Sequence, residues 1–63
     1  MGYRIKELRD KIKMSQQELV QKSGVSRGTI SALENGTARA TTTKTLLAIA
    51  DALGVTVDQI FLA

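Results

Sequence analysis

The segment 15–36 contains two sets of helix-start and helix-stop signals in close succession. Ser15 is a favoured N-cap residue, and Glu18 follows three positions later, where its carboxylate can complete a capping box. Gly24 can adopt the left-handed backbone conformation that ends many helices. Ser26 can then cap a second helix. The segment therefore predicts two short helices joined by a tight turn, which strongly limits the folds available to the chain.

The rest of the chain carries helix signals of the same kind. Three apolar pairs have the spacing of a hydrophobic staple, namely Met14 with Leu19, Val25 with Ile30, and Val55 with Ile60. Thr56 and Gln59 have the spacing of a second capping box. These signals predict an all-α, compact five-helix domain over residues 1–63, with helices at about 4–13, 16–23, 27–35, 43–53 and 57–62. In the first of these helices, an apolar stripe is expected at Ile5, Leu8 and Ile12.

The composition excludes several classes of function. The chain has 63 residues with no cysteine and no histidine, so it lacks thiolate metal ligands and the commonest general base. Its six acidic residues are scattered, and no nucleophile–base or metal-binding constellation is present. We therefore expect no enzyme activity, catalytic residue, metal, cofactor or small-molecule ligand. No apolar stretch reaches the roughly 18 residues of a membrane span, and no apolar signal region is present, so we expect a cytoplasmic protein.

The basic residues are concentrated in one part of the chain. All nine lie between Arg4 and Lys44, whereas residues 45–63 contain Asp51 and Asp58 and no basic residue. This asymmetry, with a net charge of +3, predicts that one end of the protein meets an anion. The alternative is a solvated basic face, which is common in small proteins. Combined with the two helices and the tight turn, the charge favours a helix-turn-helix motif that binds DNA.

Arg9 and Glu34 are charged residues that we expect on the inner sides of their helices. In helical projection Arg9 lies next to Leu8, and Glu34 lies beside Leu33. A charge that faces a core needs a partner, and the arginine fork suits a bidentate contact with a carboxylate. We predict a structural ion pair that fixes the first helix on the third. The alternative is two unrelated surface charges.

Four blocks of residues follow one another in a distinctive order. They are Ile5…Leu8-Arg9, then Ser15-Gln16-x-Glu18-Leu19, then Gly24-Val25-Ser26-Arg27-x-Thr29-Ile30-Ser31-x-Leu33-Glu34-Asn35-Gly36, and finally Thr45-Leu46-Leu47-x-Ile49-Ala50-Asp51-Ala52-Leu53-Gly54-Val55. Together these blocks resemble the phage repressor and Cro family of helix-turn-helix DNA-binding domains. The resemblance implies a five-helix domain that binds operator DNA as a dimer, with a paired Arg and Glu at positions 9 and 34.

On this basis we expect a sequence-specific regulator of transcription that binds double-stranded DNA. A repressor on a palindromic operator, with the third helix in the major groove, is the favoured form. The alternative is an antitoxin-like protein-interaction module whose DNA binding is secondary.

The outer side of the expected helix 27–35 holds the candidate base-reading residues. With Ile30 and Leu33 facing inward, these candidates are Arg27, Gly28, Thr29, Ser31 and Ala32. Arg27 is the long side chain suited to a guanine edge. Gly28 either permits close approach of the helix to the groove or is merely tolerated near a helix end.

Phosphate contacts are expected from helix N-termini and from polar side chains beside the reading helix. The candidates are Gln16, Gln17, Asn35 and Arg39.

The C-terminal end of the chain is apolar beyond the needs of one small core. A two-fold interface through Val57, Phe61 and Leu62 would bury this excess in a homodimer. Such a dimer would also place two recognition helices about 34 Å apart on one face of the DNA. The alternative is that Phe61 closes the core, and the two roles are compatible.

Overall fold

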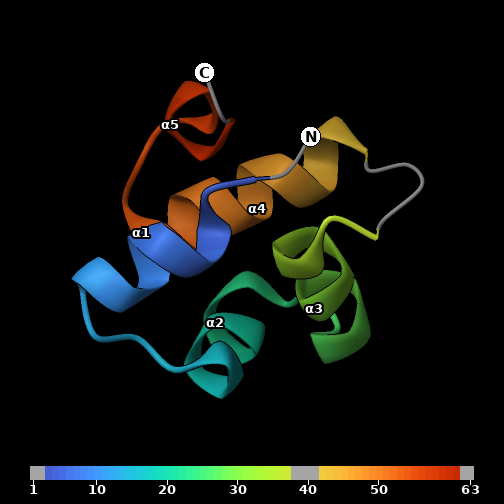
Figure 1. The fold of residues 1–63 in the computed structure, drawn as a ribbon. Coiled ribbons are helices and arrows are strands. Elements are labelled where there is room, and N and C mark those ends of the chain that lie inside the picture. Colours follow the sequence, from blue (N-terminus) through green and yellow to red (C-terminus); the bar gives the residue numbers. More distant parts are fainter. Residues whose placement is uncertain (1–2, 38–41, 62–63) are drawn as a thin grey trace.

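Within the residues that the structure describes, five helices follow one another (Figure 1). They are α1 (Ile5–Lys11), α2 (Gln16–Ser23), α3 (Arg27–Asn35), α4 (Thr43–Leu53) and α5 (Val57–Ile60). The computed structural model describes residues 3–37 and 42–61. The prediction of an all-α, five-helix fold is confirmed, and α2, α3 and α4 have the predicted bounds. Within the described ranges, no helix is both long enough and apolar enough to cross a membrane.

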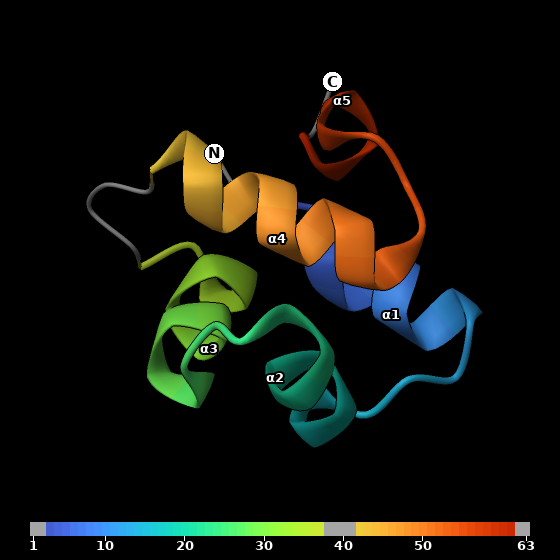
Figure 2. The same ribbon diagram turned by 180° about the vertical axis from the view of Figure 1, so that it is seen from behind.

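The helices pack so that α4 separates the α2–α3 pair from α5. Helix α2 contacts both α3 and α4, α1 contacts α3, and α4 contacts α5. Both views of the ribbon show α5 on one side of α4, with α2 and α3 on the other (Figures 1 and 2). This arrangement leaves the outer surfaces of α2 and α3 on the side of the molecule away from α5.

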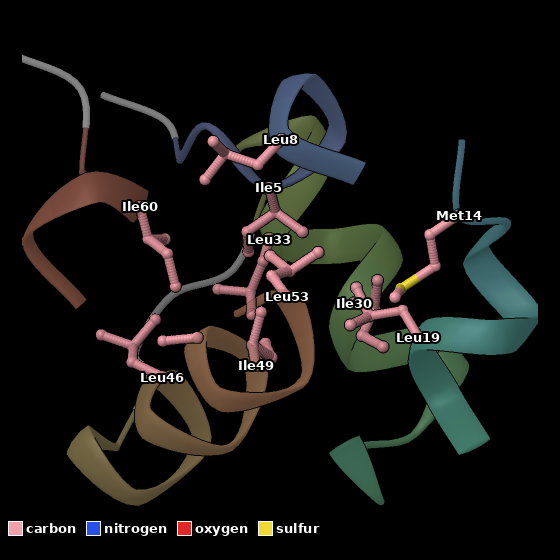
Figure 3. Close-up of a cluster of buried hydrophobic side chains, with 11 residues drawn as sticks. Ile5, Leu8, Met14, Leu19, Ile30, Leu33, Leu46, Ile49, Leu53 and Ile60 are labelled. Carbon is pink, nitrogen blue, oxygen red and sulfur yellow. The ribbon is translucent and has the colours of Figure 1, made fainter. Parts of the chain in front are cut away.

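The core consists of apolar side chains contributed by all five helices and the α1–α2 connection (Figure 3). Its buried members are Ile5, Leu8, Met14, Leu19, Ile30, Leu33, Leu46, Ile49, Ala50, Leu53 and Ile60. Each fully buried aliphatic side chain contributes roughly 1.5–3 kcal/mol of transfer free energy. All six staple residues belong to this core or pack against it, so the staple spacing identified core positions correctly.

The caps of the two central helices have the predicted geometry. Ser15 Oγ accepts a hydrogen bond from the Glu18 amide at 3.1 Å, and Glu18 Oε1 accepts one from the Ser15 amide at 3.0 Å. Gly24 ends α2 in the left-handed conformation with φ of 72°. Ser26 Oγ then accepts from the Thr29 amide at 3.3 Å and caps α3. Local hydrogen bonds thus fix the start of each helix and the turn between them.

The end of the first helix differs from the prediction. Helix α1 ends at Lys11, and Lys13 adopts a positive φ of 55°. Ile12 was expected on the buried stripe but is 51% exposed. The chain leaves the helix here because Met14, not Ile12, enters the core, and the Met14 amide donates back to the Arg9 carbonyl at 2.9 Å.

The C-terminal end of α5 also differs from the prediction. The helix ends at Ile60, and Phe61 is extended. Phe61 forms an isolated antiparallel bridge with Tyr3, and their ring centroids lie 5.6 Å apart. Phe61 is 43% exposed and packs on Tyr3, so it is not one of the buried core residues. Leu62 lies outside the described residues.

Candidate nucleic-acid interface

The first three residues of α3 are exposed to solvent. Arg27, Gly28 and Thr29 are exposed, whereas Ser31 and Ala32 are half-buried. Ile30 and Leu33 on the opposite side are fully buried. The exposed end of α3 therefore presents a long basic side chain, a bare backbone position and a hydroxyl to the solvent.

Three of the four predicted phosphate-contacting residues are described, two at the start of α2 and one at the end of α3. Gln16 is half-buried at the first position of α2, and Gln17 beside it is exposed. Asn35 is exposed at the last position of α3, where its Nδ2 donates to Ser31 Oγ at 3.4 Å. Arg39 lies outside the described residues.

Gly28 is not required by the packing of the protein itself. A β-carbon built at this position would have no heavy atom of another part of the protein within 4 Å. Glycine inside a helix costs about 0.5–1 kcal/mol relative to alanine. Any advantage of Gly28 therefore has to come from something that approaches α3 from outside.

The structure brings Arg9 and Glu34 together. Arg9 Nε lies 2.9 Å from Glu34 Oε2, and Nη2 lies 3.4 Å from Oε1. Only 11% of the Arg9 side chain and 6% of the Glu34 side chain are exposed. The hydrogen bond that Arg9 donates to Glu34 raises the pKa of Arg9, desolvation opposes this, and the charges of Glu34 and Asp10 add to the rise. Arg9 Nη1 also donates to the Met14 carbonyl at 2.9 Å, so the pair joins α1, α3 and the chain before α2.

Two further hydrogen bonds extend this pair to the exposed end of α3. Gln16 Nε2 donates to Glu34 Oε1 at 3.2 Å, and Arg27 Nε donates to Gln16 Oε1 at 3.1 Å. Gln16 and Arg27 were predicted as separate DNA contacts, and the hydrogen bond between them was not predicted. The sequence feature that could have indicated this contact is that Gln16 and Arg27 are each the first residue of a capped helix.

Both acidic residues of the segment 15–36 are engaged by protein groups. Glu34 bonds Arg9 and Gln16. Glu18 accepts the Ser15 amide, and this hydrogen bond holds the pKa of Glu18 below its ordinary value of 4.5. Arg27 is thereby left as a cation at an exposed helix start, with both carboxylates directed to other partners. An anionic ligand is favoured at such a position.

The family comparison agrees with this geometry. The helix-turn-helix family model matches residues 5–60. The chain belongs to the helix-turn-helix family. The predicted resemblance to repressor-type helix-turn-helix domains is thus confirmed over residues 5–60.

A solved structure shares the fold. The restriction-modification controller protein C.AhdI from Aeromonas hydrophila is 31% identical, with a TM-score of 0.84. The alignment covers 92% of this helix-turn-helix protein and 86% of the controller chain. No match was found among curated protein sequences. Family and neighbour together support DNA-binding regulation of transcription.

Proposed function

We propose that this protein is a sequence-specific repressor that binds a palindromic DNA operator as a homodimer, with α3 in the major groove. The observation that carries the proposal is the exposed N-terminal half of α3, where Arg27, Gly28 and Thr29 stand free of the core. The B-DNA major groove, about 12 Å wide, admits an α-helix in this way. The likeness to a controller protein supports a regulatory role.

The division of labour between the side chains follows from their chemistry and position. Arg27 reads a guanine edge through its fork, and Thr29 and Ser31 contact a base or a phosphate. Ala32 is suited to a thymine methyl group, and Gly28 allows the helix backbone to approach the groove. We assign the phosphate contacts to Gln16 and Gln17 at the start of α2, to Asn35 at the end of α3, and to Arg39, which follows α3 in the sequence.

The homodimer is proposed to form through the end of the molecule away from α3. Val57 is half-buried, and Phe61 exposes 43% of its surface beside Tyr3. Leu62, which follows Phe61 in the sequence, is the third residue of the proposed interface. A two-fold axis there makes the same patch face itself and buries it. It also presents two copies of α3 to successive major grooves, about 34 Å apart. The protein would act in the cytoplasm, where an operator is accessible.

Selection of bound sequences from random duplex DNA tests the proposal. The expected result is an inverted repeat whose half-site centres are about one helical turn apart. Binding should weaken with salt, with a log–log slope of about −0.9 per neutralised phosphate. Failure to enrich any sequence, or binding that ignores salt, would instead favour the antitoxin-like module.

A further inference from the structure

A continuous run of hydrogen bonds connects the buried ion pair to the proposed base-reading side chain. It passes from Arg9 through Glu34 and Gln16 to Arg27, with donor–acceptor distances of 2.9, 3.2 and 3.1 Å. The run crosses from α1 to α3, from α3 to α2, and from α2 back to the first residue of α3. We call its last three members, Glu34, Gln16 and Arg27, the relay; Arg9 lies outside it.

The Gln16 amide can serve this relay in only one orientation. Its Nε2 faces the Glu34 carboxylate, and its Oε1 faces Arg27 Nε. A reversed amide would set oxygen against the carboxylate and N–H against the guanidinium N–H, so both hydrogen bonds would be lost. The negative charge of Glu34 therefore selects the orientation in which Gln16 presents an acceptor to Arg27.

This acceptor fixes the plane of the Arg27 guanidinium without using the part that reads a base. The bond to Gln16 engages Nε. Among the described residues, the hydrogen bond of Arg27 uses Nε alone, so the N–H groups on its two terminal nitrogens can reach guanine O6 and N7. Because the guanidinium is planar, holding Nε sets the direction of the whole fork. Pre-ordering of this kind lowers the entropy cost of a bidentate contact.

We propose that Glu34 and Gln16 are positioning residues for base reading by Arg27, in addition to their roles in the ion pair and in phosphate binding. The proposal rests on the proposed function. Glu34 is the decisive member, because only 6% of its side chain is exposed and it has no access to DNA of its own. Any influence of Glu34 on base preference is therefore indirect, and the hydrogen bonds through Gln16 are the route that leads to Arg27.

The test compares Glu34→Gln and Gln16→Met with the wild type on two duplexes. One duplex is the selected site, and the other carries a changed base pair at the position whose preference disappears in Arg27→Ala. Glu34→Gln removes the charge that orients the Gln16 amide, and Gln16→Met removes the amide at similar size. Circular dichroism at the binding temperature establishes that each variant is folded. Should Glu34→Gln not fold, Gln16→Met carries the test alone.

The measured quantity is the ratio of the affinity for the selected site to the affinity for the changed duplex. A good bidentate pair gives a ratio of about 5 to 150. We expect this ratio to fall by roughly three- to tenfold in both variants. For Glu34→Gln the salt slope should stay unchanged, because no phosphate contact is removed. Arg9→Lys is the matched control, since it weakens the same ion pair from the far side and leaves Gln16 and Arg27 in place. It should keep the wild-type ratio.

Three outcomes would overturn the proposal. The first is an unchanged ratio in folded variants. The second is an equal loss on both duplexes with a salt slope shallower by about 0.9, which marks a phosphate contact. The third is the same fall in ratio for Arg9→Lys, which marks general loosening of the fold.

A readout without DNA separates this proposal from the proposed function. The Arg27 Nε–H resonance of the free protein should shift in both Gln16→Met and Glu34→Gln, and stay in place in Arg9→Lys. If the wild type selects no DNA sequence while this pattern holds, the proposed function fails although the relay exists. If the wild type selects a site and the resonance does not move, the relay fails and the proposed function stands.

Discussion

Arg9 and Glu34 form a bidentate ion pair that is almost wholly enclosed between α1 and α3, with Arg9 Nε 2.9 Å from Glu34 Oε2. Removing one partner of such a pair leaves an uncompensated charge and costs about 3–5 kcal/mol. We therefore expect Arg9→Met to lower the free energy of unfolding by this amount. Glu34→Gln should cost less, because its amide oxygen still accepts a hydrogen bond from Arg9.

Denaturant unfolding of both single variants and the double variant checks this prediction. The double variant should lose clearly less than the sum of the single losses, since the two groups interact directly. Small and additive losses, of the about 0–1 kcal/mol typical of exposed pairs, would contradict it.

Gly28 and Gly24 offer a matched pair of glycine substitutions. A β-carbon at Gly28 meets open space, so Gly28→Ala should stabilise the free protein by about 0.5–1 kcal/mol. Gly24 has φ of 72°, so Gly24→Ala should destabilise it by about 1–2 kcal/mol. Thermal unfolding measures both effects. If α3 approaches the groove closely at Gly28, the stabilised variant should nevertheless bind DNA more weakly, whereas unchanged binding would mean that Gly28 is only tolerated.

Arg27→Ala should weaken binding to the selected site by roughly 1–3 kcal/mol and relax the preference at one base position in each half-site. Lys22→Ala is the control, because Lys22 is an exposed basic residue on α2. This substitution also removes one positive charge, but from a residue that is not a candidate for base reading. Affinity measured on a set of single-base variants of the site distinguishes the two. A loss spread evenly over all variants for Arg27→Ala would reduce it to a phosphate contact.

Glu18 gives the stability of the domain a dependence on acid pH. The Ser15 amide holds the pKa of Glu18 below its ordinary value of 4.5. A lowered folded-state pKa stabilises the protein above the unfolded-state value, and this stabilisation is lost as pH falls through the folded-state pKa. Glu18→Gln should therefore melt at a lower temperature than the wild type at pH 7. The gap should close as pH falls below about 4.5. If the difference in melting temperature between the wild type and Glu18→Gln were the same at pH 7 and well below pH 4.5, the prediction would be contradicted.

The proposed dimer predicts how the protein sediments. Phe61→Ala and Leu62→Asp should weaken self-association, and DNA affinity should fall with it because a monomer holds one half-site. Since Phe61 is 43% exposed, the fold should survive its replacement. Leu47→Ala is the control, because Leu47 is an exposed apolar residue on α4, 54% accessible. Sedimentation of the wild type and each variant, with and without a duplex that carries two half-sites, measures self-association and DNA binding. Identical behaviour of Leu62→Asp and the wild type would place the interface elsewhere.

The bounds of α2, α3 and α4 could be predicted from the sequence because short-range contacts set them. A cap joins residues three positions apart, as Ser15 and Glu18 do, and a glycine end depends on one backbone angle, as at Gly24. The Arg9–Glu34 contact is long-range in sequence, but it follows from two charges on inner helix faces. Each of them needed a partner, and each was a suitable partner for the other.

Tertiary structure decided the positions of apolar residues for which the local sequence allowed more than one packing partner. Ile12 continued the helical stripe, yet Met14 took the core position and the helix ended first. Phe61 continued the apolar run of α5, yet it left the helix to pair with Tyr3 at the other end of the chain. In both cases the outcome depended on the space between elements distant in sequence, which no local pattern encodes.

The contact between Gln16 and Arg27 is the clearest case of this kind within the candidate site. Each residue was identifiable alone, from its place at the start of a capped helix. Their hydrogen bond required the crossing of α2 and α3, and that crossing is set by packing of the buried faces. The sequence by itself therefore determined which side chains stand at the exposed helix starts. The packed core decided which of them touch, because a hydrogen bond needs its atoms within about 3 Å and only the relative placement of whole helices supplies that accuracy.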